Sequence, residues 1–144
     1  MLKAKQETVE LYIDPKADPP FTMKSKLLKD GKLTFKNDHH PGFIVDFNIV
    51  DDGGGYLFPD DEKDALAAGE LQPGKPTCPK HGAEWDEFEP LEVTNGNRTL
   101  RVQNHNNDPA EFGFTMFVTK NGKKPYLELD PIGDNRNGPR TVNR

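Results

Sequence analysis

The sequence predicts an all-β protein: a two-sheet antiparallel sandwich with one short helix in a long loop. Three observations lead to this fold class. The hydrophobic fraction of the 144 residues is only 33%, and the 13 glycines and 13 prolines suit short strands and turns better than helices. Several stretches alternate apolar and polar residues, which is the period of a strand with one buried face. Residue pairs that favour tight turns separate these stretches.

The clearest pattern is a hairpin in residues 111–131. Its first arm carries apolar side chains at alternate positions, at Phe112, Phe114, Met116 and Val118. Asn121-Gly122 follows, and both residue types tolerate the positive φ angles of a two-residue hairpin turn. Leu127 and Leu129 continue the alternation on the return arm. We therefore expect two long antiparallel strands joined at this turn.

Four further strands are expected in the first half of the chain, at residues 8–13, 26–29, 32–36 and 43–50. Asp14-Pro15 ends the first, because proline donates no backbone hydrogen bond and restricts the residue before it. Asp30-Gly31 is the turn signal between the second and the third. Lysines in this region predict a sheet edge that is protected by charge. They are Lys24, Lys26, Lys29, Lys32 and Lys36.

Residues 51–88 form a long insertion with little strand pattern. Loops longer than about 15 residues are uncommon in compact domains and are often functional. Acidic residues follow Pro59, and Gly69 closes the stretch, so we expect a short helix over residues 60–68. The insertion also holds the single tryptophan, Trp85.

The second half and the domain limits follow from the same reasoning. Strands at 92–94 and 99–103 flank a turn at residues 95–97. We expect one sandwich domain at residues 1–132, with the insertion inside it, and a polar C-terminal tail at 133–144.

Composition narrows the classes of partner. The net charge is −5, from 24 acidic and 19 basic residues without a basic stripe, so no nucleic-acid partner is expected. No segment approaches 18 consecutive apolar residues, so no membrane partner is expected either. The single cysteine, Cys78, allows no internal disulfide, and the first residues lack an apolar signal-peptide segment. We expect a cytoplasmic protein without a cofactor, although a chain whose leader was removed has the same features.

Two dipeptides of the second half, Glu89-Pro90 and Asp130-Pro131, each adjoin an expected strand. With the chain length and the β pattern, they give the chain a resemblance to the DP-EP family of small bacterial proteins, over roughly residues 7–138. The resemblance implies a sandwich of immunoglobulin-like or cupredoxin-like type, and no catalytic residues. In physical terms, both dipeptides are interpreted as strand terminators, because proline interrupts the ladder and a carboxylate accepts a backbone N–H at a turn.

A metal site is one functional hypothesis. Cys78 and His81 have ligand-like spacing, and a transition metal needs three or four such groups. If the strands run strictly up and down, His105 lies at the same end of the sandwich, whereas His39 and His40 lie at the other. Met116 is a further candidate ligand. A cupredoxin copper site, however, needs cysteine, histidine and methionine close together near the final hairpin, and Cys78 lies far from Met116 in the sequence. The competing interpretation is a solvent-facing loop with incidental cysteine and histidine.

Acidic and glycine-rich stretches of the insertion suggest two other sites. Residues 51–55 and 60–62 could supply oxygen ligands to calcium, but their spacing does not match an EF-hand loop. The glycines at 53–55 lack the lysine and hydroxyl residue of a phosphate-binding P-loop. A turn followed by a helix N-terminus explains the same residues.

Aromatic residues of the insertion give the preferred functional hypothesis. Tyr56, Phe58 and Trp85 are candidate binding residues, because tyrosine and tryptophan are enriched where proteins bind partners. The alternative is that they cap one end of the sandwich. A regular scaffold with one long aromatic loop and no credible catalytic set predicts a non-enzymatic binding or assembly module for an unknown protein or small ligand. The runner-up is a cupredoxin-like metal-binding protein using Cys78, His81 and His105.

Assembly is predicted from the sheet edges. Residues 126–129 carry little charge, so another copy of the chain could pair with this edge and form a homodimer. The alternative is a monomer in which residues 133–144 cover the edge.

Overall fold

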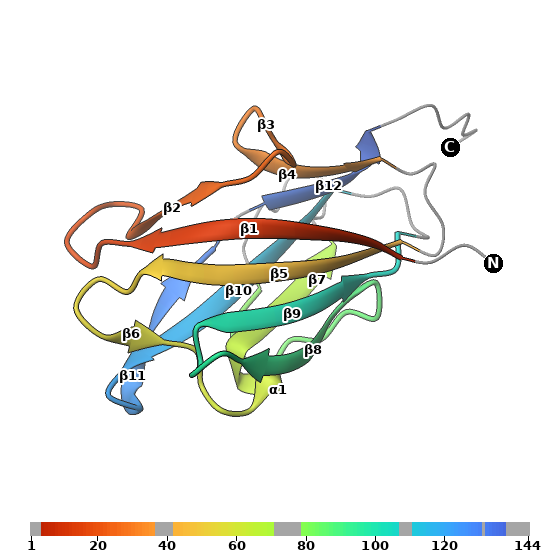
Figure 1. The fold of residues 1–144 in the computed structure, drawn as a ribbon. Coiled ribbons are helices and arrows are strands. Elements are labelled where there is room, and N and C mark those ends of the chain that lie inside the picture. The colour runs from red at the N-terminus through yellow and green to blue at the C-terminus, as the bar shows by residue number, and fades with distance from the viewer. Residues whose placement is uncertain (1–3, 37–41, 71–78, 107–110, 131, 138–144) are drawn as a thin grey trace.

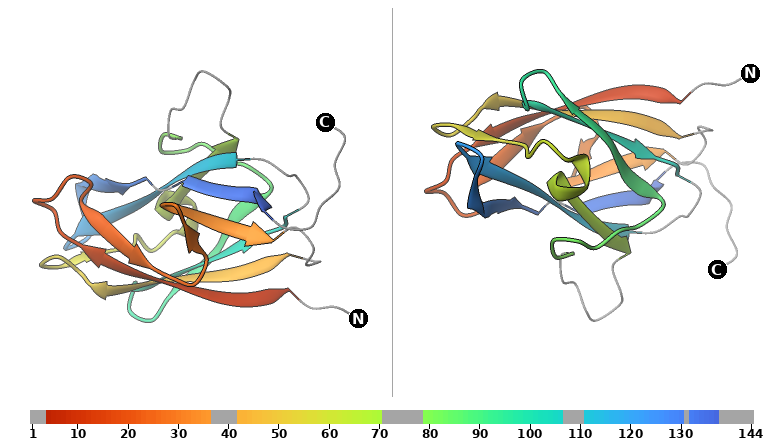
Figure 2. Two further views of the ribbon diagram at one scale, coloured as in Figure 1. Left: turned by 90° about the horizontal axis from the view of Figure 1, so that it is seen from above. Right: turned by 90° about the horizontal axis from the view of Figure 1, so that it is seen from below.

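The computed structural model describes residues 4–36, 42–70, 79–106, 111–130 and 132–137. Within these residues, two β-sheets pack face to face, and a single helix of one turn lies at one side of them (Figure 1). Figure 2 shows the two sheets as separate layers when the molecule is seen from above and from below. The predicted all-β sandwich with one short helix in its long loop is confirmed.

Sheet A has five strands in the order β2-β1-β5-β9-β8. Their bounds are β2 Phe21–Lys24, β1 Lys5–Ile13, β5 Phe43–Asp51, β9 Thr99–Asn104 and β8 Phe88–Thr94. The predicted turn at residues 95–97 joins β8 to β9, whose last pair is Thr94 with Thr99.

Sheet B is built around the predicted hairpin. Its main path is β11-β10-β12-β4-β3, and β6 and β7 also pair with β10. The bounds are β11 Lys123–Leu129, β10 Glu111–Lys120, β12 Ile132–Asn137, β4 Lys32–Lys36, β3 Leu28–Lys29, β6 Tyr56–Leu57 and β7 Leu66–Glu70. The hairpin turn is at Asn121-Gly122, as expected, and both residues have positive φ.

A cluster of aromatic side chains fills the space between the sheets. Phe88 is central: its ring centroid lies 4.9 Å from that of Phe112 and 4.8 Å from that of Phe114. Phe47 of sheet A lies 5.7 Å from Phe114 of sheet B. Phe112, Phe114, Met116 and Val118 are buried as predicted, and on the return arm Leu129 is buried and Leu127 is half-buried.

The pairing is not antiparallel throughout. β1 and β5 run parallel over the length of β1, and β4 and β12 also run parallel. Parallel neighbours need a connection that crosses from one end of the sandwich to the other. Here β2, β3 and β4 lie in the chain between β1 and β5, so the chain visits both sheets before it returns.

The helix is shorter than the expected range of 60–68. α1 covers Glu62–Ala65, and Asp61 caps it by accepting the backbone N–H of Lys63 at 2.9 Å. Residues Leu66–Glu70 form strand β7 instead, which pairs with residues 112–116 of β10. Pairing with a long buried strand therefore overrides the helical preference of leucine and alanine.

Residues 133–137 belong to the sheet rather than to a tail. β12 continues the line of β11 along the same side of β10, because Met116 pairs with Leu129 and Gly113 pairs with Ile132. β12 also pairs with β4 on its other side. The rest of the expected tail, residues 138–144, lies outside the described residues.

Only one of the two proline dipeptides fits the strand-terminator interpretation. Asp130 follows the end of β11, and Pro131 lies outside the described residues. Glu89 and Pro90 lie inside β8, where the register with β9 shifts between Pro90 and Glu92. The prediction that Glu89-Pro90 ends a strand is wrong, because β8 is at the edge of sheet A, where a proline is tolerated.

Candidate functional site

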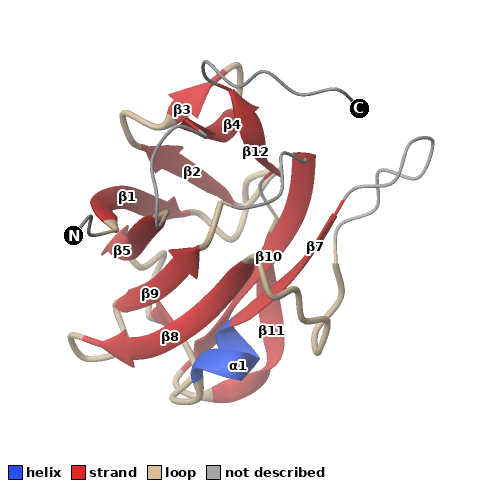
Figure 3. Cartoon of the chain, turned by 90° about the vertical axis from the view of Figure 1, so that its right-hand side faces the viewer, coloured by secondary structure: helices blue, strands red, loops and turns tan. Residues whose placement is uncertain are grey.

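A pocket of about 230 Å³ opens between α1, β7, β8 and the chain segment that leads into β8. We call it the Trp85 pocket, and Figure 3 shows this side of the molecule. Leu66, Ala68 and Phe88 supply apolar wall, and the Trp85 side chain is half-buried beside them. The full lining is Lys63, Leu66, Ala68, Ala83, Glu84, Trp85, Asp86, Phe88, Glu89 and Pro90.

Local hydrogen bonds fix the position of Trp85. Its carbonyl accepts the backbone N–H of Phe88 at 3.1 Å, which closes a turn directly before β8. Two residues earlier, the Ala83 carbonyl accepts the N–H of Ala68 at 3.3 Å and ties the segment to β7. The indole packs on Phe112, with ring centroids 5.1 Å apart. One wall of the pocket is therefore attached to both sheets.

The start of the same segment is fixed to the outer face of sheet B. The hydroxyl of Thr115 donates to the carbonyl of Pro79 at 2.8 Å. The His81 ring stacks on Tyr126, with centroids 4.9 Å apart, and meets the edge of Phe117 at 5.0 Å. His81 Nε2 also lies 3.3 Å from Oδ1 of Asp64 on α1. We call residues 79–85 the cover segment.

Charged residues form part of the pocket lining. The lining contains three acidic residues, Glu84, Asp86 and Glu89, but one basic residue, Lys63. Glu89 Oε1 lies 2.8 Å from Nε2 of His105. Within the part of the chain that the structure describes, Glu84 and Asp86 have no ion-pair partner.

The predicted binding aromatics occupy different environments. Trp85 lines the pocket. Tyr56, in β6, is partly buried and packs on the core. Phe58 is 1% exposed and belongs to the core, so its side chain offers no surface to a partner. The capping alternative therefore describes Phe58, whereas the binding hypothesis depends on Trp85 and Tyr56.

The structure describes only some of the candidate metal ligands. His81 and His105 contact different carboxylates, those of Asp64 and Glu89. Cys78, His39 and His40 lie outside the described residues, and Met116 is fully buried in the core. Among the side chains that are described, no group of three His, Cys, Asp or Glu residues could hold a metal ion.

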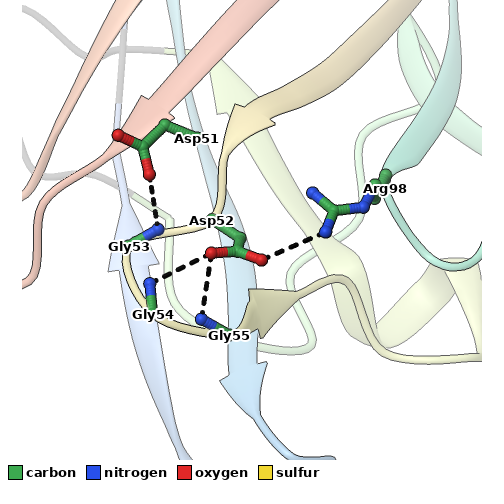
Figure 4. A network of polar contacts seen from close by, with 6 residues as sticks. All are labelled: Asp51, Asp52, Gly53, Gly54, Gly55 and Arg98. Atoms are coloured by element: carbon green, nitrogen blue, oxygen red, sulfur yellow. Dashed lines mark hydrogen bonds and ion pairs between the residues drawn. The ribbon is translucent and has the colours of Figure 1, made fainter.

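The first acidic stretch of the insertion closes a turn (Figure 4). Asp52 Oδ1 accepts the N–H groups of Gly54 and Gly55 at 3.0 and 3.1 Å, and its Oδ2 lies 3.1 Å from Nη2 of Arg98. Asp51 accepts the N–H of Gly53 at 3.0 Å. A side chain at Gly53 would place Cβ 2.7 Å from the carbonyl oxygen of Ile13, and its φ is +61°, so glycine is required there.

These contacts perturb the acidity of Asp52. The backbone N–H of Gly54 is the largest influence that lowers the pKa of this carboxyl, and Arg98 lowers it further. The second acidic stretch is also occupied, because Asp60 accepts the side-chain amide of Asn97 at 2.6 Å and Asp61 caps α1. Turn and cap formation therefore explains both acidic stretches, which is the simpler of the two predicted interpretations.

The outer face of sheet A carries paired polar side chains. Arg101 contacts both carboxylate oxygens of Asp46, with Nε–Oδ1 and Nη2–Oδ2 distances of 2.8 and 3.0 Å. This hydrogen-bonded carboxylate raises the pKa of Arg101. Thr99 donates to Asn48 Oδ1 at 2.8 Å on the same face. The face is therefore stabilised by contacts between its own strands.

Sequence reasoning found Trp85 but missed most of the pocket. The sequence predicts a helix at Leu66 and Ala68 and the end of a strand at Pro90, whereas these residues lie in β7 and β8. The run Glu84-Trp85-Asp86 was a usable signal, because two charged residues beside a loop tryptophan suggest a ring near a polar surface.

Comparison with known proteins adds no assignment: no protein-family model matches the chain, and no curated protein matches it. In the described residues, no helix is long and apolar enough to cross a membrane.

Proposed function

We propose that this protein is a non-enzymatic binding module whose ligand-contacting part is the segment between β5 and β8. The observation that carries the proposal is the Trp85 pocket, where α1, β7 and residues 83–86 of that segment meet strand β8 of sheet A. Function-bearing loops are commonly displayed on a rigid scaffold in this way. Among the described residues, the lining has no Ser, Thr, Cys or His side chain, so it holds no Ser–His or Cys–His pair.

A fragment screen monitored by ¹H–¹⁵N NMR tests the proposal. Fragments that bind should shift the amide signals of residues 66–68 and 83–90. Trp85→Ala should abolish these shifts, whereas Tyr12→Ala, an aromatic change on the outer face of sheet A, should keep them. The proposal fails if fragments leave the pocket signals unchanged or bind only elsewhere.

Tyr56 is proposed as a secondary contact residue. Tyr56→Ala should leave the fold intact and weaken association with a partner. Because Tyr56 packs partly on the core, thermal unfolding must accompany the binding measurement. A variant that unfolds at the assay temperature would assign Tyr56 to the core and remove it from the binding hypothesis.

The metal-binding function stays a prediction, and no contact favours it over the pocket. Elemental analysis of untagged protein decides it. A stoichiometric transition metal that is lost on Cys78→Ser would establish the metal function, and metal-free protein of normal stability would reject it.

The proposal also includes the family resemblance, the cellular location and the oligomeric state of the protein. The DP-EP resemblance and the cytoplasmic location stay predictions. A homodimer through β11 is supported by the position of that strand at the end of the sheet B path. Light scattering at several concentrations, with and without residues 138–144, tests the dimer, and a monomer in both forms rejects it.

A further inference from the structure

We propose that the Trp85 pocket binds an ammonium or guanidinium group carried on a short apolar stem. The inference rests on the proposed function, because it names a class of ligand for the same pocket. Size, wall chemistry and charge support it independently.

The size of the pocket suits a group no larger than one amino-acid side chain. Its volume is about 230 Å³, whereas pockets for drug-sized ligands have roughly 300–1,000 Å³. Leu66, Ala68 and Phe88 provide apolar contacts at the walls. A chain of four or five methylene groups can use such contacts while its charged end stays near water.

The charged residues of the lining favour a positive end group. The lining holds three acidic residues and one lysine, and among the described residues only Glu89 of the three acids contacts a histidine, His105. Some carboxylates of the protein are neutralised by a basic side chain, such as Glu7 by Lys26, Asp46 by Arg101 and Asp52 by Arg98. Glu84 and Asp86 have no such partner in the described part of the chain.

The indole of Trp85 adds a second preference for a cation. An aromatic face attracts ammonium and guanidinium groups, and tryptophan does so most strongly. Trp85 stands between Glu84 and Asp86 in sequence, so the aromatic wall and the two carboxylates belong to one short turn. The same carboxylates would repel an anionic ligand.

Lys63 competes with such a ligand for the negative charge of the pocket lining. Its side chain lines the pocket and carries the same charge as the proposed end group. Removing that charge with Lys63→Gln should strengthen binding of a cation by about threefold to tenfold, since neighbouring like charges repel. A purely apolar pocket would show no such increase.

Three probes of equal chain length test the inference on the full chain: pentylammonium, 1-pentanol and pentanoate. Amide shifts of residues 66–68 and 83–90 report binding. Pentylammonium should bind about tenfold more tightly than 1-pentanol, and pentanoate should bind most weakly. The double variant Glu84→Gln/Asp86→Asn should lose this preference. Glu128→Gln, which removes an exposed carboxylate on β11, should keep it.

Two peptides distinguish the sources of the cation. If acetyl-Gly-Lys-Gly-amide binds and its norleucine analogue does not, the group belongs to a polypeptide. If pentylammonium binds and the lysine peptide does not, the ligand is a small amine. Equal binding of all three pentyl probes would overturn the inference and leave the binding function intact. The absence of shifts with all three also overturns it, and the fragment screen then decides separately whether the pocket binds anything.

Discussion

The outer faces of the two sheets differ in what covers them. On sheet A the outer face is open, and its side chains form pairs such as Asp46–Arg101 and Asn48–Thr99. On sheet B, Thr115, Phe117 and Thr119 of β10 point away from the core and are still at most 6% exposed. The cover segment accounts for part of this burial through its contacts with Thr115 and Phe117.

This difference explains where the pocket forms. A sheet whose outer residues pair among themselves needs no further layer. A sheet that carries Phe117 on its outer face needs a covering segment, and here residues 79–85 provide it. The same segment then continues past β7 to Trp85, so covering sheet B also places a pocket wall.

The largest expected effect comes from removing the side chain that the cover segment buries. Phe117→Ala should lower the free energy of unfolding by about 3 kcal/mol, as for other buried phenylalanines. Ile44 is half-buried on the outer face of sheet A, so Ile44→Ala should cost roughly 1 kcal/mol, because it removes less buried apolar surface. Urea denaturation measures both. Equal losses would remove the contrast between the two faces.

A smaller effect is expected at the contact between the cover segment and sheet B. His81→Ala removes the stacking on Tyr126 and the contact with Asp64, and should cost about 1 kcal/mol. Amide hydrogen exchange should rise at residues 79–85 and stay unchanged in β1 and β5. A uniform rise across both sheets would mean that His81 supports the whole fold rather than the cover segment.

The turn at residues 51–55 connects β5 of sheet A to β6 of sheet B, and its contribution to stability should depend on pH. The pKa of Asp52 is lowered in the folded protein, so its stabilising contacts are present above the ordinary aspartate pKa of about 4 and are lost as pH falls below it. Asp52→Asn should therefore lose less stability than the parent protein between pH 5 and pH 2. Asp51→Asn, which affects a carboxylate with one backbone contact, is the matched control. Identical pH profiles for parent and Asp52→Asn would contradict the assignment.

The smallest effect is expected on the open face. A double-mutant cycle with Asp46→Asn and Arg101→Gln should give a coupling energy of at most about 1 kcal/mol, because both side chains are partly exposed to water. Raising the salt concentration should reduce it. A coupling several times larger would mean that sheet A depends on this pair as strongly as sheet B depends on Phe117.

The sequence was most informative where periodicity and turn chemistry coincide. The hairpin of residues 111–131 and the turns at Asp30-Gly31 and 95–97 were predictable, because alternating burial and positive φ act within a few residues. The extent of α1 was not, because β7 is determined by pairing with β10, more than 40 residues away. The parallel neighbours and β12 likewise depend on partners far along the chain.

The candidate site was predictable only in part for the same reason. Trp85 was identifiable as an aromatic residue in a long insertion. Phe58 is equivalent to it in sequence, but the fold buries Phe58 in the core cluster. The pocket combines α1, β7 and β8, and residue spacing along the chain does not reveal that these elements meet.

The central claim is that the segment leading to Trp85 is fixed on the sandwich before any ligand binds. Nuclear Overhauser contacts in the ligand-free protein test this most directly, because Trp85 is the single tryptophan and its indole signals are unambiguous. We predict contacts from Trp85 to Phe112 and from His81 to Tyr126. Random-coil shifts for residues 79–86, without either contact, would contradict the account.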